Sequence, residues 1–142
     1  MTDANEMRVQ EVRIRSELAR LRRMLRSYSG APDALSLAVQ MTRMVGAWRR
    51  IIVARERFVY QPRLASPSEA DALIARTCQE RMMTTARRVR NFAWNWSSSA
   101  LIASDFDRFR YQATALMVAI EAHFDCDRSL LGVDDGARRI AA

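Results

Sequence analysis

The sequence predicts an all-α protein, an up-down-up-down bundle of four helices. Four segments carry apolar residues at steps of three and four, the spacing that lines one face of a helix. The chain has only four glycines and three prolines, too few for the many turns of a β-rich fold. A length of 142 residues is typical of one domain. We therefore expect a single domain over residues 1–142, with its core at about 7–131 and a frayed C-terminal tail at 132–142.

The first helix is expected to run from about Met7 to Tyr28. The run Ser29-Gly30-Ala31-Pro32 ends it, because glycine commonly follows the last helical turn and proline follows shortly after. The inward face of this helix carries only apolar residues. They are Met7, Ile14, Leu18, Leu21 and Leu25.

The second helix is expected to begin after Asp33, whose side chain suits an N-cap. It ends at Tyr60-Gln61-Pro62, because proline disfavours helix in the residue before it. Its inward face is wide and includes one charged residue. The members are Leu37, Met41, Met44, Val45, Trp48, Ile51, Ile52, Arg55, Phe58 and Val59.

The third helix is expected to begin at Ser66-Pro67-Ser68-Glu69, a capping-box pattern with proline at the first helical position. The polar run Ser97-Ser98-Ser99 ends or loosens it. Either Arg81 or Met82 completes its inward face. The other members are Ile74, Cys78, Thr85, Val89, Phe92 and Trp96.

The fourth helix is expected to follow Ser104-Asp105-Phe106-Asp107, whose carboxylates suit a helix N-terminus. Gly132 ends it after about Leu131. Its inward face is apolar at first and polar near its end. The members are Phe109, Ala113, Leu116, Ile120, His123, Asp127 and Leu130.

The only histidine of the chain lies on that inward face. His123 precedes Asp127 by four residues, so an imidazole and a carboxylate point into the core one turn apart. Helical bundles hold metal ions with such pairs of ligands. The other inward faces offer almost nothing to complete a metal site.

Three segments resemble the bacterial hemerythrin-like (HHE) domains. The run VAIEAHFDCDRSLL is similar to the last helix of that family, in which a His-x-x-x-Glu/Asp pair precedes a hydrophobic helix end. The run SGAPDALSLAVQMTRMVGAWRRIIVARERFVYQPRL resembles its second helix with a Tyr-Pro-containing exit, and CQERMMTTARRVRNFAWNW its aromatic-ended third helix. The resemblance spans about residues 10–131 and implies a four-helix bundle around two iron ions.

The ligands that this resemblance implies are mostly replaced. Aligned on the Tyr-Pro exit, the second helix has Ile51 in place of the family's histidine and Arg55 in place of its glutamate. Sliding by one residue offers Ile52 and Glu56, again without a histidine. The histidine of the first helix falls near Leu18, and the third helix has none.

Arg55 makes a retained metal site unfavourable, because a guanidinium has no lone pair to donate and its charge repels a metal cation. We expect an ion pair between Arg55 and Asp127, with His123 hydrogen-bonded nearby, since an unpaired buried charge is very costly. Arg81 is the competing cation. In the alternatives, Arg55 extends to the end of the bundle and His123 is an ordinary core histidine, or His123 and Asp127 hold a single metal ion.

The charge favours acidic partners in general, since all 23 basic residues are arginine and the net charge is +7. Seven arginines lie between Arg8 and Arg26, a density that also suits nucleic acid. Glu6, Glu11 and Glu17 are interleaved with them, so we expect the solvated face of a helix rather than a nucleic-acid interface.

Neither a membrane span nor a secretory signal is expected, because no apolar run approaches 18 residues and the chain begins with polar residues. The two cysteines, Cys78 and Cys126, are too few for a disulfide framework. We expect a cytoplasmic protein with reduced thiols. Cys126 is either a redox-responsive or an incidental thiol.

A partner interface is expected at Trp94, which cannot share the core-facing side of its helix with Trp96. Aromatic residues, methionine and arginine are enriched at interfaces, and Met82, Met83 and Trp48 are further candidates for exposed positions. Either a homodimer or another protein would cover this surface.

These observations favour a non-catalytic regulatory or sensory binding protein without a cofactor, on a hemerythrin-like bundle that has lost its di-iron site. No nucleophile or acid–base pair is arranged for catalysis. The alternative is an iron-containing sensor of oxygen, nitric oxide or redox state, and a nucleic-acid binder is a third hypothesis.

Overall fold

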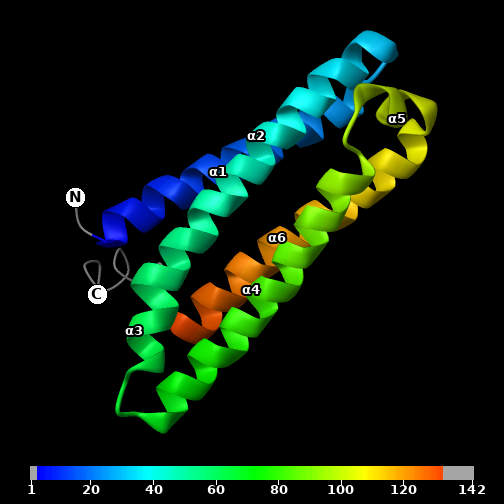
Figure 1. The fold of residues 1–142 in the computed structure, drawn as a ribbon. Coiled ribbons are helices and arrows are strands. Elements are labelled where there is room, and N and C mark those ends of the chain that lie inside the picture. The colour runs from blue at the N-terminus through cyan, green and yellow to red at the C-terminus, as the bar shows by residue number, and fades with distance from the viewer. Residues whose placement is uncertain (1–2, 133–142) are drawn as a thin grey trace.

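The computed structural model describes residues 3–132, and every regular element within them is a helix (Figure 1). The expected all-α class is confirmed. Four helices have 24 to 27 residues each. They are α1 (Asp3–Arg26), α2 (Ala31–Arg55), α4 (Glu69–Asn95) and α6 (Phe106–Leu131). Three shorter elements connect them, namely the π-helix η1 (Glu56–Tyr60), α3 (Gln61–Leu64) and α5 (Ser99–Ser104).

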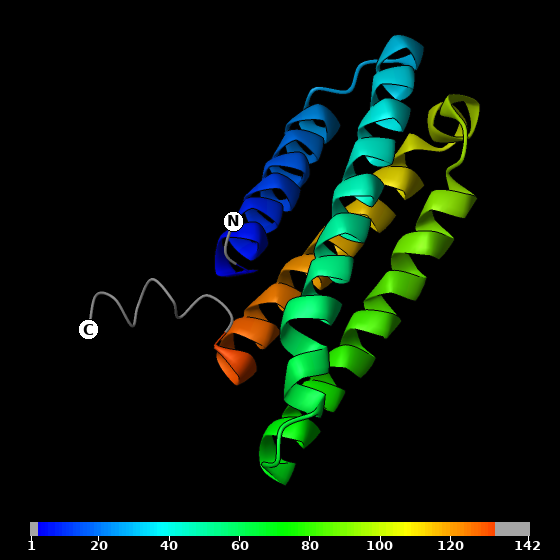
Figure 2. The same cartoon turned by 60° about the vertical axis from the view of Figure 1, so that its left-hand side comes forward.

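The long helices lie in two neighbouring pairs. Helix α1 packs mainly on α2, and α4 packs mainly on α6 (Figures 1 and 2). Helix α5 packs against α2 at one end of the molecule, whereas η1 and α3 lie at the other end. In the described range, no helix is long and apolar enough to cross a membrane.

The residue that caps the N-terminus of α2 differs from the expected one. Helix α1 begins at Asp3, earlier than expected, and Gly30 rather than Asp33 occupies the N-cap position of α2, with φ 157°. Asp33 lies inside the first turn of α2 and accepts hydrogen bonds from the amide and the hydroxyl of Ser29, at 2.6 and 2.9 Å. Its carboxylate therefore holds the loop that precedes the helix.

The second helical segment was expected to end before Pro62, but it continues through η1 and α3 to Leu64. Its final part changes hydrogen-bond pattern, because the Gln61 amide donates to the carbonyl of Glu56, five residues earlier. Pro62 then lies in the first turn of α3, where a proline needs no amide hydrogen. A π-turn needs one more residue than an α-turn to return to the same face. Arg55 and Tyr60 are therefore both buried although they are five residues apart.

The third long helix begins later than expected. Ser68 is its N-cap and accepts a hydrogen bond from the Asp71 amide at 3.3 Å, so the capping residue is not Ser66. Of the two candidates for its inward face, Met82 is buried and Arg81 is exposed. The serine run ends α4, and Ser98 caps the short helix α5, which the sequence did not predict.

Both ends of α6 agree with expectation, apart from one inward residue. The Asp105 side chain caps the helix by accepting from the Arg108 amide at 3.3 Å, and Gly132 ends it in the left-handed conformation, with φ 62°. Leu131 is buried, whereas Leu130 is exposed. At about 100° per residue, four steps beyond Asp127 return closer to the inward direction than three. The rest of the expected C-terminal tail lies outside the described residues.

The core contains two apolar clusters. The larger includes an aromatic group at the α5 end, in which Phe92 and Trp96 pack on Phe109 with ring centroids 5.6 and 5.4 Å apart, and Tyr28 stacks on Phe106 at 3.6 Å. The smaller lies at the η1 end. It consists of Met7, Ala54, Val59, Tyr60, Cys78, Met82 and Leu131.

Candidate functional site

A group of buried polar side chains joins the two apolar clusters. We call Arg55, Tyr60, His123 and Asp127 the buried polar cluster. Arg55 is 1% exposed and Asp127 0%, and the other two side chains are also buried. Arg55 ends α2, Tyr60 ends η1, and His123 and Asp127 lie one turn apart on α6. Such groups are seldom buried unless they are paired.

Asp127 is the acceptor at the centre of this cluster. Its Oδ2 accepts hydrogen bonds from Arg55 Nη1 at 2.9 Å and from the Tyr60 hydroxyl at 2.5 Å. His123 Nε2 lies 3.5 Å from the same oxygen and 3.3 Å from the Tyr60 hydroxyl. The expected contact between Arg55 and Asp127 is confirmed, and the alternative in which Arg55 extends to solvent is wrong.

Arg55 also faces a second carboxylate. Its Nη2 lies 3.8 Å from Glu11 Oε2, and its guanidinium lies over the ring of Phe124, 5.0 Å from the centroid. Glu11 in turn accepts hydrogen bonds from Arg15 and Arg128, at 2.9 and 3.2 Å. Arg55 therefore connects Asp127 to a network of surface arginines through Glu11.

Glu11 and Tyr60 are members of the site that the sequence analysis missed. Glu11 was placed on the solvated face, but it is buried. A signal for its burial was present, because position 11 fills the gap in the inward face between Met7 and Ile14. Tyr60 carried no such signal, since only the π-turn after Arg55 turns it inward.

Burial sets the protonation states in the cluster. It lowers the pKa of His123, and nearby Arg55 lowers it further, whereas Asp127 opposes this shift. Burial, followed by the charge of Asp127, raises the pKa of Tyr60 above its ordinary value and that of Cys78 to about 12. The buried polar cluster therefore holds a neutral imidazole and a protonated phenol, and the neighbouring thiol of Cys78 is protonated as well.

The cluster is not fully hydrogen-bonded. Within residues 3–132, Asp127 Oδ1, His123 Nδ1, Arg55 Nε and Trp48 Nε1 are buried without a hydrogen-bond partner. The Trp48 ring packs edge-on to His123, with centroids 5.9 Å apart. Unsatisfied polar atoms in a core lower the stability of the fold. The loss of the hydrogen bonds to Asp127 from Arg55 and Tyr60 would leave more such atoms, so these bonds are important for stability.

The donor set does not fit a di-iron centre. His123 and Asp127 are two ligands from one helix, and the described part of the chain contains no group of three His, Cys, Asp or Glu side chains placed to hold a metal ion. The guanidinium of Arg55 pairs with one carboxylate oxygen of Asp127, Oδ2, and its positive charge opposes the binding of a cation there. Ile51, which stands where the resemblance implies a histidine ligand, is buried in the larger apolar cluster.

The competing cation, Arg81, lies elsewhere. It is exposed, and its guanidinium contacts the sulfur of Cys126. Cys126 is half-buried beside it, whereas Cys78 is buried. Arg81 therefore does not replace Arg55 as the partner of Asp127.

The expected interface residues separate into two groups. Trp94 is 82% exposed and Met83 57%, as expected for surface positions. Met82 and Trp48 are buried, which agrees with their places on inward helical faces, and the suggestion that they belong to an exposed interface is wrong. Met82 lies one turn from both Cys78 and Thr85 on the buried face of α4, and Trp48 packs on Phe124 and His123.

Comparison with known proteins adds no relative. No protein-family model, curated protein or solved structure matches this chain.

Proposed function

We propose that this chain is a non-catalytic regulatory or sensory binding protein, built on an up-down-up-down four-helix bundle of the hemerythrin-like kind whose di-iron site has been lost. The packing of the long helices supports this topology, because helices that follow one another in the chain lie side by side: α1 packs on α2, and α4 packs on α6. The resemblance of three segments to hemerythrin-like domains supports the family.

One observation carries the proposal, namely the buried ion pair between Arg55 and Asp127. The resemblance implies a glutamate ligand at position 55 and a carboxylate ligand at position 127. A guanidinium at the first position satisfies the charge of the second without a metal ion. It would also repel iron cations in a low-dielectric interior by several kcal/mol.

Metal analysis of the purified protein tests this proposal. Expressed in iron-replete medium, the protein should contain far less than a stoichiometric di-iron load and should lack the near-ultraviolet charge-transfer bands of an oxo-bridged centre. Stoichiometric iron with those bands would establish the alternative, an iron-containing sensor, and refute the proposal.

A partner or homodimer interface on α4 completes the proposal. Met83 and Trp94 are both strongly exposed, and eleven residues separate them, so they lie about 16 Å apart on one face of the helix. Arg87 and Arg90 are exposed between them. Sedimentation of wild type and Trp94→Ala should show association that the substitution weakens, with little change in thermal stability. A wild type that remains monomeric at high concentration excludes the homodimer.

A further inference from the structure

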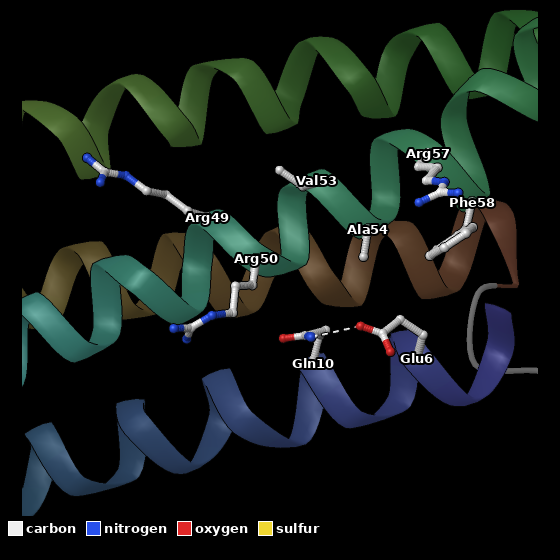
Figure 3. Close-up of a pocket in the computed structure, with 8 residues that line it drawn as sticks. All are labelled: Glu6, Gln10, Arg49, Arg50, Val53, Ala54, Arg57 and Phe58. Atoms are coloured by element: carbon white, nitrogen blue, oxygen red, sulfur yellow. Dashed lines mark hydrogen bonds between the residues drawn. The ribbon is translucent and has the colours of Figure 1, made fainter. Parts of the chain in front are cut away.

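A groove of about 520 Å³ lies between α1 and the last turns of α2 (Figure 3). Its α1 side is formed by Glu6 and Gln10, which are hydrogen-bonded to each other at 2.9 Å. The apolar part of its other side consists of Val53 and Ala54 of α2 and Phe58 of η1. Val53 is 66% exposed, so the groove presents apolar surface that the chain itself leaves uncovered.

Three arginines surround this apolar surface. Arg49, Arg50 and Arg57 line the groove, and Figure 3 shows the guanidinium groups of Arg49 and Arg50 on opposite sides of α2. Over residues 3–132, none of the three forms an ion pair with a carboxylate, and Arg57 packs over the ring of Phe58 at 5.2 Å. Arg15 of α1, by contrast, is paired with Glu11.

The apolar surface continues toward α4. Val53 and Arg57 also line a second groove of about 500 Å³, which Met83 and Gln79 border on the other side. Glu56 lines it too, and its carboxylate accepts hydrogen bonds from Gln61 and Gln79. Met83 is strongly exposed there. The residues Val53 and Arg57 thus form a ridge between two shallow grooves, with apolar side chains on both sides.

We propose that this double groove binds an acidic amphipathic helix of a partner protein. The inference rests on the proposed binding function and names the chemistry of the partner. The apolar stripe of the helix would pack on Val53, Phe58 and Met83, as in other helix-in-groove complexes. Its flanking carboxylates would pair with Arg49, Arg50 and Arg57, which form no ion pair with a carboxylate within residues 3–132. A second copy of this chain is disfavoured as the occupant of this double groove, because each copy carries a net charge of +7 and the three arginines on the rim favour an acidic partner.

A designed probe tests the proposal. The probe is a fluorescein-labelled peptide of about twenty residues, long enough to be helical, with leucines along one face and glutamates beside them. The matched control peptide has lysine in place of every glutamate. Fluorescence anisotropy should show saturable binding of the glutamate peptide, at least about tenfold tighter than that of the lysine peptide at low salt, because the rim charges are complementary only to the first.

Variants of the protein locate the binding surface. Arg50→Gln with Arg57→Gln should weaken binding about tenfold and reduce its salt dependence, and Val53→Ser should weaken it about threefold. Arg108→Gln on the first turn of α6 is the matched control, since it removes an exposed arginine far from the groove and should leave binding unchanged. Every substituted residue is exposed, so we expect all variants to fold. Thermal melting followed by circular dichroism verifies this.

Four results would overturn the inference: no binding at about millimolar peptide, equal binding of the two peptides, wild-type affinity in the double arginine variant, or self-association that Val53→Ser abolishes. The last result would identify a second copy as the occupant. None of these results changes the iron content, so the proposal of a lost di-iron site stands or falls separately.

Discussion

The α5 end and the η1 end of the core are held together by different kinds of contact. At the α5 end, Phe92, Trp96 and Phe109 pack ring against ring in regular α-helices. At the η1 end, Arg55 and Tyr60 donate to a single oxygen of Asp127, and the helix that carries them changes to a π-turn. Both ends exclude water, but the first relies on shape and the second on specific partners.

This difference predicts different responses to substitution. Apolar contacts are non-directional, so a smaller apolar side chain loses only part of its contribution. A buried charge depends on its partner, so the loss of one member leaves the other uncompensated. Substitutions at the η1 end should therefore lower the free energy of unfolding more than those at the α5 end, and their losses should be strongly non-additive.

The largest effect is expected for Arg55→Met. It leaves the Asp127 carboxylate buried without its ion-pair partner, and the free energy of unfolding should fall by about 3–5 kcal/mol. The double variant Arg55→Met with Asp127→Leu should recover much of this loss, because no charge remains buried. Urea denaturation of the two single variants and the double variant measures the coupling. Additive losses would mean that the pair is not energetically coupled and that the contrast between the two ends is wrong.

Tyr60→Phe is expected to have the next largest effect. The substitution keeps the ring and removes only the hydroxyl that donates to Asp127, so the unfolding free energy should fall by about 1.5–3 kcal/mol. The matched control is Tyr28→Phe, because Tyr28 stacks on Phe106 at the aromatic end through its ring. That control should change stability much less. Equal losses in the two variants would show that the hydroxyl of Tyr60 contributes nothing specific.

The pH dependence distinguishes the two ends further. Burial holds the pKa of His123 in the fold below its ordinary value of 6.5. As the pH falls below about 6.5, the unfolded chain binds a proton that the folded chain does not, so stability falls by at most about 1.4 kcal/mol per pH unit. Above that pH the contribution is complete. Denaturation between about pH 5 and 8 should show a flatter profile for His123→Gln than for wild type, and parallel profiles would contradict the assignment of a neutral, buried imidazole.

The smallest effect is expected at the aromatic end, for Phe109→Leu. Leucine fills much of the same volume, so the loss should be about 1–1.5 kcal/mol. It should be the same across that pH range, since the ionisable groups that contact these rings, Tyr28 and Arg110, do not change charge between about pH 5 and 8. Thermal melts at two pH values measure both properties. A loss that depends strongly on pH would mean that the two ends are coupled.

The expected pairing of Arg55 with Asp127 illustrates what could be anticipated at the site. Both residues lie on inward helical faces, and a buried charge requires an opposite charge at similar depth. The same argument failed for Glu11, because its position on the inward face was outweighed by the number of arginines around it. For the third long helix the sequence left Arg81 and Met82 as alternatives on the inward face, and the structure selects Met82, since that choice depends on which way α4 turns toward α6.

The sequence by itself determined the features that arise from residues close together in the chain. The helical class follows from periodic apolar faces, and the ends of α6 follow from the capping of Asp105 and the left-handed Gly132. These are local, because capping and amphipathic spacing act within one or two turns.

Only the tertiary structure decided the π-turn and with it the place of Tyr60. An α-turn and a π-turn differ locally by one residue in hydrogen-bond register, and nothing within residues 56–60 selects between them. The selection comes from α6, because a π-turn lets the Tyr60 hydroxyl reach Asp127 while Arg55 stays bonded to the same oxygen. The pairing of Arg55 with Asp127 followed from two inward helical faces, but the contact of Tyr60 with Asp127 depends on the π-turn and was found only in the folded chain.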